Sequence, residues 1–260
     1  MECGILFVVA LGWERAAIAR EIDALPFGRK DGARMLRGNE QHRGLWILET
    51  GMGTERARAA IRWAAEVMRP TVVLSTGCAG SLVAGPRGGD VVVAEEIVSA
   101  RGGAIATNAA WRERYRRAAV DARVPVWESR MLTTSRVLLG SEEKRRLGEE
   151  ANARAVEMEG AALAEWAQAA GIEFAAARVI LDPVETSLPP EIPGITTDAG
   201  SLSPRLLLRA IGRRPALILE LARLAAATLK CRRALAAVHR ELIRGLSHDG
   251  VVTMVCCQNQ

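Results

Sequence analysis

Four carboxylates stand where expected strands meet loops or helices, and carboxylates can cleave a glycosidic bond without a metal or a histidine. They are Glu14, Glu157, Glu159 and Asp182. In such a reaction one acid protonates the leaving group, another activates water, and negative charge stabilises the oxocarbenium-like sugar. Structural roles also fit them: Glu14 suits a first helical turn, Glu157 and Glu159 suit a helix start, and Asp182 suits a turn. Taken singly, each residue favours the structural role.

Signatures of other enzyme classes are missing from the sequence. No GxGxxG follows the first expected strand, and the chain holds neither GxxxxGK[ST] nor GxSxG. The three histidines, His42, His239 and His248, form no ligand-like cluster with cysteines or carboxylates. We therefore expect no metal, no organic cofactor and no serine hydrolase chemistry.

Apolar strands alternate with helical segments, and this alternation predicts an α/β fold whose central sheet is covered by helices on both faces. Ligands in such folds gather at the carboxyl ends of strands. Gly51–Gly53, Gly77–Gly80 and Asp182 all fall at such ends. The strands are expected at 4–10, 45–48, 71–76, 90–98, 124–132 and 173–181, and helices at 13–25, 54–68, 109–122, 141–150 and 158–170.

Charge is unevenly spread along the 260 residues, whose net charge is +5. Residues 203–245 hold ten basic side chains against two acidic ones, which indicates a local anionic partner. An aromatic content of 4% and the lack of a nucleic-acid-binding motif disfavour nucleic acid. The chain divides into an α/β domain at 1–202, a basic helical extension at 203–246 and a tail at 247–260, with a loop or lid at 183–204.

The cellular location is expected to be cytoplasmic. An acid stands near the start, where a secretion signal has basic residues, and no apolar run reaches the roughly 18 residues of a membrane span. Five cysteines without CxxC spacing suit a reducing compartment.

Taken together in this order, several segments resemble the purine nucleoside phosphorylase/nucleosidase superfamily, and most of all its methylthioadenosine/adenosylhomocysteine nucleosidases. The VEMEG-A pattern with a downstream R-(x)3-D is the most specific feature, and the likeness spans about residues 4–185. It implies a mixed central sheet of the nucleoside phosphorylase type and a homodimer or larger homo-oligomer that completes the 5′ pocket across a subunit contact. The segments are ALGWE at 10–14, TGMG at 50–53, STGCAGS at 75–81, AVEMEGAA at 155–162 and RVILD at 178–182.

The resemblance also implies roles for individual residues. Asp182 is similar in position to the general acid that protonates adenine N7, and Glu14 to the residue that activates the nucleophilic water. Glu159 is similar to the carboxylate that holds the ribose hydroxyls, with Met158 packed against the sugar. Substrate contacts are further expected from Glu157, Cys78, Ala79, Gly80, Arg178, Gly51 and Gly53.

Two departures from the superfamily pattern bear on the nucleophile. Cys78 stands where the family usually has Ser or Thr, and a thiol is a weaker hydrogen-bond donor. Phosphorylases usually carry an arginine near the position of Ser75 to bind phosphate, so its absence here favours water. Two alternatives stay open: a phosphate-dependent purine nucleoside phosphorylase, and a non-catalytic nucleoside-binding or membrane-associated module.

A further set of segments consists of LDP at 181–183, LPP at 188–190 and residues 206–235 with RRP at 213–215. Together they resemble the hopanoid-associated phosphorylase-like proteins, a subfamily linked to removing adenine from adenosylhopane to leave ribosylhopane in hopanoid biosynthesis. An enzyme that acts on such a lipid-linked nucleoside must work at or near a bilayer. Basic amphipathic helices can lie on the anionic inner membrane face. The same apolar faces would equally suit packing on their own domain or on a partner subunit. The basic residues concerned are Arg205, Arg209, Arg213, Arg214, Arg223, Lys230, Arg232 and Arg233.

Overall fold

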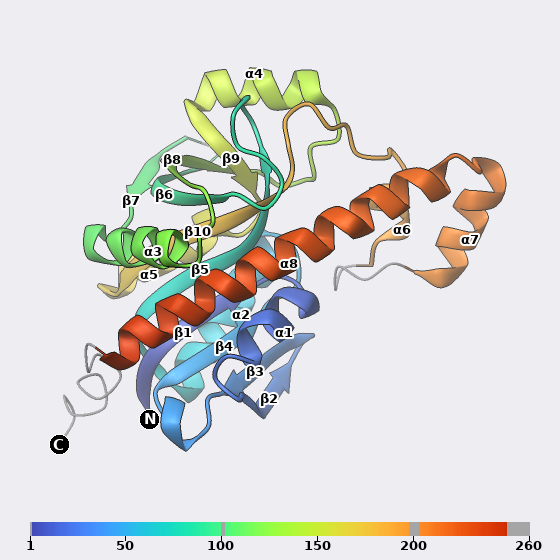
Figure 1. The fold of residues 1–260 in the computed structure, drawn as a ribbon. Coiled ribbons are helices and arrows are strands. Elements are labelled where there is room, and N and C mark those ends of the chain that lie inside the picture. Colours follow the sequence, from blue (N-terminus) through green and yellow to red (C-terminus); the bar gives the residue numbers. More distant parts are fainter. Residues whose placement is uncertain (1, 100–101, 198–202, 249–260) are drawn as a thin grey trace.

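The computed structural model describes residues 2–99, 102–197 and 203–248, which form a mixed sheet of ten strands with helices on both faces (Figure 1). The strands are β1 (Cys3–Val9), β2 (Leu25–Lys30), β3 (Ala33–Arg37), β4 (Leu45–Glu49), β5 (Arg69–Ser81), β6 (Val91–Ser99), β7 (Ala104–Ala106), β8 (Val126–Thr133), β9 (Ala153–Glu157) and β10 (Glu173–Asp182). The helices are α1 (Gly12–Ala19), α2 (Thr54–Val67), α3 (Ala109–Asp121), α4 (Ser141–Ala151), α5 (Gly160–Ala170), α6 (Ile192–Ile195), α7 (Pro204–Arg213) and α8 (Leu217–His248).

Strand β5 joins the two halves of the sheet. It runs parallel to β1 on one side and parallel to β10 on the other, and its last residues also pair antiparallel with β9. Since β10 pairs with β6, β6 with β8 and β8 with β9, these five strands close into a ring. The closure brings Gly80, Val156 and Asp182 together, because Gly80 pairs with both of the others.

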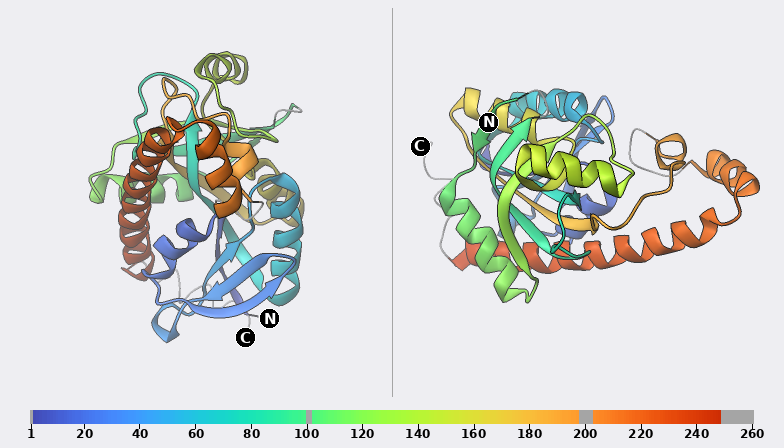
Figure 2. Two further views of the ribbon diagram at one scale, coloured as in Figure 1. Left: turned by 90° about the vertical axis from the view of Figure 1, so that its right-hand side faces the viewer. Right: turned by 90° about the horizontal axis from the view of Figure 1, so that it is seen from above.

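The core lies on both faces of the sheet. Ile5 and Phe7 of β1 face a cluster that includes α1, α3 and α8, whereas Leu6 and Val8 face a cluster that includes α2 and α5. The alternation follows the two-residue period of a strand, and all four side chains are buried because both faces are covered. Figure 2 shows α8 and α2 on opposite sides of the sheet.

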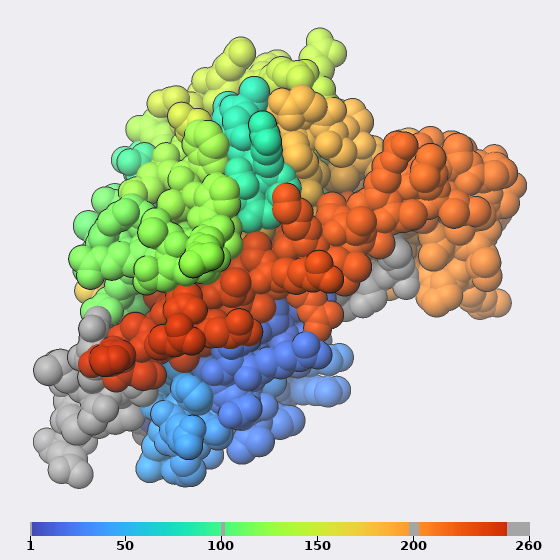
Figure 3. Space-filling view, in the orientation of Figure 1, coloured from blue at the N-terminus to red at the C-terminus, as the bar shows by residue number. Residues whose placement is uncertain are grey.

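Helix α8 has two unlike halves. Cys231, Leu235, Val238 and Leu242 are buried against α1 and α3, at the spacing of one helical face. Residues 217–230 and α7 instead project beyond the sheet; we call these two segments the arm (Figures 1 and 3). The boundary at residue 203 stays a prediction, but the second half of the basic extension shares the core of the α/β domain.

Local structure departs from expectation in several places. The helix expected at 13–25 ends at Ala19, and the hairpin of β2 and β3 follows, which was missed because β2 is largely exposed and lacks alternation. Strand β9, five residues long, and the short β7 were also not anticipated. Of the 247–260 tail, residues 249–260 lie outside the described residues, as do 198–202 of the expected loop or lid. Within the described ranges, no helix is both long enough and apolar enough to span a bilayer.

Acid sensitivity is expected from His239, which is buried in the core. Its Nδ1 bonds to the Leu235 carbonyl at 2.8 Å, and burial lowers its pKa from 6.5 to about 4. The unfolded chain therefore takes up this proton first, so stability contributed by the neutral ring is lost as the pH falls from about 6.5 towards 4. When the free energy of unfolding is measured with urea at pH values from 7 to 4.5, it should fall less steeply for His239→Gln than for the parent. Equal slopes for His239→Gln and the parent would contradict the assignment.

Candidate active site

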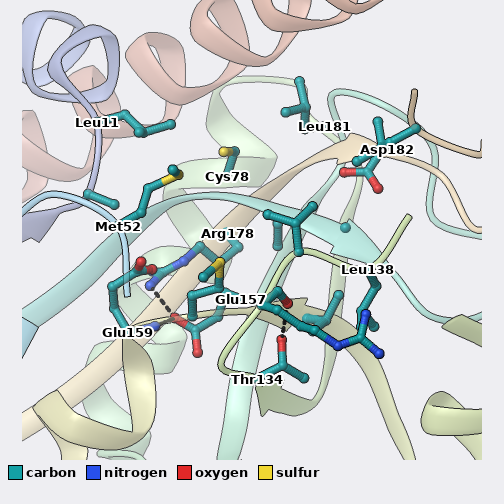
Figure 4. Close-up of a pocket in the computed structure, with 18 of the residues that line it drawn as sticks. Leu11, Met52, Cys78, Thr134, Leu138, Glu157, Glu159, Arg178, Leu181 and Asp182 are labelled. Atoms are coloured by element: carbon teal, nitrogen blue, oxygen red, sulfur yellow. Dashed lines mark hydrogen bonds and ion pairs between the residues drawn. The ribbon is translucent and has the colours of Figure 1, made fainter. Parts of the chain in front are cut away.

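One cavity of about 190 Å³ opens at the ends of β5, β9 and β10 and beneath the loops after β1 and β4 (Figure 4). Nine of the eleven residues that the sequence proposes for the site line it. They are Glu14, Cys78, Ala79, Gly80, Glu157, Met158, Glu159, Arg178 and Asp182. The other two glycines lie just behind it: Gly53 bonds to Glu159, and the Gly51 N–H donates to the Ala10 carbonyl.

Glu14 bridges the loop after β1 and strand β5. Its Oε2 accepts the backbone N–H groups of Ala10 and Leu11 at 3.0 and 2.9 Å, and its Oε1 accepts that of Cys78 at 2.8 Å. Burial raises the pKa of this carboxyl, although the Leu11 and Cys78 N–H groups, the Cys78 thiol and Arg178 act in the opposite direction. The approach requires glycine at 77, because a Cβ there would lie 2.6 Å from Oε1 and the backbone φ is +141°.

Glu157 is an anion enclosed by donors. Its Oε1 accepts the Thr133 hydroxyl at 2.5 Å, and its Oε2 accepts the backbone N–H groups of Glu159 and Gly160 at 2.9 and 2.7 Å. Oε2 also accepts a bond from Arg178 at 2.9 Å. Because these bonds occupy both oxygens at the start of α5, the carboxylate is suited to hold Arg178 rather than to react.

Arg178 is buried at the centre of the cavity floor. Besides Glu157, its guanidinium donates to the Ser75 hydroxyl at 2.8 Å. Ser75 and Thr133, which no motif in the sequence marks as site residues, therefore fix the Arg178–Glu157 pair. Their contacts join different strands, and no local spacing marks them.

Glu159 stands before α5 and reaches the loop after β4. Its Oε1 accepts the Gly53 N–H at 2.7 Å, and the residues that the structure describes offer no hydrogen bond to Oε2. Burial, followed by repulsion from Glu157, raises its pKa to about 8. At neutral pH the group is therefore largely a neutral carboxyl, which can both donate to and accept from a diol.

Asp182 ends β10 and bonds to a wholly buried lysine that was not predicted. Lys144 Nζ of α4 lies 2.6 Å from Asp182 Oδ2 and also donates to the carbonyls of Thr186 and Pro183 at 2.8 and 3.4 Å. Burial raises the pKa of Asp182, and the Lys144 cation opposes that rise. Lys144 escaped detection because it lies within a run of charged residues that resembles a solvated helix face.

Cys78 places its thiol in the cavity wall and remains neutral. Burial, and then the nearby Glu14 carboxylate, raises the pKa of the thiol well above its usual value. It can thus contribute only a weak donor.

An apolar region completes the cavity. Leu11 and Met52 come from the loops after β1 and β4, and Leu188 and Ile192 from the segment after β10. Leu224 comes from the arm. The cavity therefore combines a charged floor with an aliphatic wall.

Comparisons with known proteins agree with this architecture. Residues 4–212 match the family model described as the phosphorylase superfamily, whereas no curated protein matches. A 5′-methylthioadenosine/S-adenosylhomocysteine nucleosidase from Neisseria meningitidis, in complex with methylthio-immucillin-A, is 17% identical with a TM-score of 0.72. A futalosine hydrolase mutant from Helicobacter pylori is 18% identical with a TM-score of 0.71; each alignment covers 95% of this chain and 100% of the other.

A third structure carries a nucleoside. The D198N mutant of the Helicobacter pylori nucleosidase, with 5′-methylthioadenosine in its active site, is 21% identical with a TM-score of 0.62. That alignment covers 71% of this chain and 87% of the other. At these identities the likeness establishes a shared fold.

Proposed function

The chain belongs to the phosphorylase superfamily, and from this premise we propose that it is a purine nucleosidase that hydrolyses a 5′-modified adenosine and releases adenine. One observation carries the proposal: Glu14, Glu159 and Asp182 are far apart in the sequence but line the same cavity. A pure binding module has no need for buried carboxyls with raised pKa values placed as acid and base.

In the proposed reaction, protonated Asp182 donates to adenine N7 while the bond between C1′ and N9 breaks, so the base leaves neutral. Glu14, as carboxylate, takes a proton from the water that attacks C1′. Glu159 holds the ribose hydroxyls. Proton transfer by a placed side chain contributes about 10²–10⁴-fold to such a rate. The net result is one water consumed, with the protons on Asp182 and Glu14 restored through solvent.

The ion pairs of the basic side chains in the cavity favour water over phosphate as the nucleophile. In the described part of the chain, the basic side chains that line the cavity are Arg136 and Arg178. Arg136 pairs with Glu143, and Arg178 pairs with Glu157. Because a glutamate already neutralises each guanidinium, a phosphate dianion would find little uncompensated positive charge.

The nucleophile is tested by a change of buffer. We expect adenine release at the same rate with and without inorganic phosphate, because water needs no cation to hold it. Chromatography of the sugar product provides the second readout and should show a free anomeric hydroxyl. A requirement for phosphate, together with a ribose 1-phosphate product, would instead establish the phosphorylase alternative.

For the 5′ substituent we propose the hopanoid chain of adenosylhopane. The aliphatic wall formed by Leu188, Ile192 and Leu224 supports an apolar group, and the arm extends from that wall. Leu208, Ile218 and Leu219 of the arm are more than half exposed.

We further propose that the arm lies on the anionic inner face of the membrane, where each basic residue contributes about 1 kcal/mol. Basic side chains on the arm, among them Arg205, Arg209 and Arg223, accompany the exposed leucines and isoleucine. A homodimer that completes the 5′ pocket is part of the same proposal.

A further inference from the structure

Lys144 is a buried cation to which the proposed reaction assigns no role. Its side chain has no exposed surface, and its ammonium donates to Asp182 Oδ2, to the Thr186 carbonyl and to the Pro183 carbonyl. These three bonds match the three protons of an ammonium, so none remains for a substrate. The group acts on the reaction only through Asp182 and through the turn that follows it.

We propose that Lys144 is a positioning residue for the general acid: it fixes the Asp182 carboxyl by one oxygen and stabilises the carboxylate that remains once the proton has left. This inference rests on the proposed function. The bond from Lys144 engages Oδ2, and the cavity that Asp182 lines leaves Oδ1 as the oxygen for the proton that reaches the base.

The backbone makes this placement rigid. The pairing of β10 with β5 shifts register between Ile180 and Asp182, and Gly80 lies opposite the carboxyl. A Cβ at Gly80 would lie 3.0 Å from Asp182 Oδ2, so the carboxyl occupies space that a larger residue at 80 would take. The ammonium also donates to the Pro183 and Thr186 carbonyls, so it links the carboxyl to the turn that follows it.

The chemical step balances with Lys144 charged throughout. The O–H bond of Asp182 breaks, an N–H bond forms at N7, and the electrons of the broken glycosidic bond move into the base. Asp182 thereby changes from neutral to negative at 2.6 Å from a fixed positive charge. The fixed cation favours the product of proton transfer over its reactant, and no ion has to move during the step.

Lys144 is the charged group closest to this carboxyl. The Cys78 thiol on β5 and the Cys231 thiol on α8 also experience the Asp182 charge; burial raises the pKa of both thiols, so both stay neutral. Across the cavity, Arg178 is paired with Glu157. A change of charge at Lys144 should therefore register directly at Asp182.

The test compares variants with and without the cation. Lys144→Gln keeps a hydrogen-bond donor and removes the charge, Lys144→Arg keeps the charge, and Arg145→Gln changes an exposed neighbour on the same helix. Loss of the cation should lower kcat by about ten- to a hundredfold with little change in KM. It should also move the basic limb of the kcat profile upward by about one pH unit, because Asp182 then holds its proton more tightly. In Lys144→Arg and Arg145→Gln the basic limb of the kcat profile should stay at the parent's position.

Each outcome has a defined meaning. A kcat for Lys144→Gln equal to the parent's would overturn the inference. So would changes in both kcat and KM that leave the basic limb of the pH profile of kcat in place. Either result would leave Lys144 a structural residue. Lys144→Met fills the same buried space without charge and repeats the measurement if the glutamine variant does not fold. Retained activity in Asp182→Asn would instead overturn the proposed function itself, whereas an inactive Asp182→Asn beside a parent-like Lys144→Gln overturns only this inference.

Discussion

Asp182→Asn should lower kcat/KM for adenine release by about 10²–10⁴-fold, the contribution of a placed general acid. An amide N–H is too weakly acidic to protonate N7, so the base would have to leave as an anion. The exchange keeps the shape of the side chain and an oxygen that can accept the Lys144 bond. The measurement is a steady-state assay of adenine release, with thermal unfolding to show that the fold persists.

Asp90→Asn provides the matched control for this variant. Asp90 is also a buried aspartate, and its Oδ2 accepts bonds from the Arg87 N–H and the Trp127 indole, but it does not line the cavity. It should retain activity close to the parent's. If Asp182→Asn kept activity within about threefold, proton donation by Asp182 would be refuted.

Glu14→Gln should reduce kcat by about 10²–10⁴-fold while KM changes little. The amide cannot take a proton from water, yet Glu159 would still bind the ribose. A second effect comes from geometry: both Glu14 oxygens accept backbone N–H groups, and the NH₂ of glutamine cannot accept at one of them. We therefore also expect a stability loss of about 1–3 kcal/mol.

Glu49→Gln separates the two effects. Glu49 is a similarly buried glutamate that pairs with Arg15 at 2.5 Å and does not line the cavity. Its variant should lose stability without a comparable loss of kcat. A Glu14→Gln enzyme whose defect lay wholly in KM would rule out the assigned role of water activation.

The fold class and the superfamily could be predicted from sequence because the signals are local. Apolar strands such as Gly4–Ala10 and Thr71–Thr76 mark a buried sheet, and the VEMEG-A segment carries several chemical groups at fixed spacing. The comparisons confirm the superfamily and the mixed α/β fold. Closeness to the hopanoid-associated subfamily stays a prediction, as do the catalytic roles.

What sequence could not supply depends on contacts between distant segments. Lys144 meets Asp182 across 38 positions, and Ser75 meets Arg178 across 103. Neither Lys144 nor Ser75 differs locally from a solvated helix residue or a strand polar residue. In α8 the spacing of Leu235 and Leu242 indicates an apolar face, but only contacts between distant segments place that face in the core of the α/β domain rather than on a partner or a membrane.

The most direct test of the account measures adenine release from adenosylhopane in detergent and from methylthioadenosine, both in phosphate-free buffer. Faster release from methylthioadenosine would support the proposed chemistry but would leave the arm with a role in packing. We predict phosphate-independent release from adenosylhopane at a rate well above that from methylthioadenosine. No release from either substrate would contradict the account and leave a nucleoside-binding module.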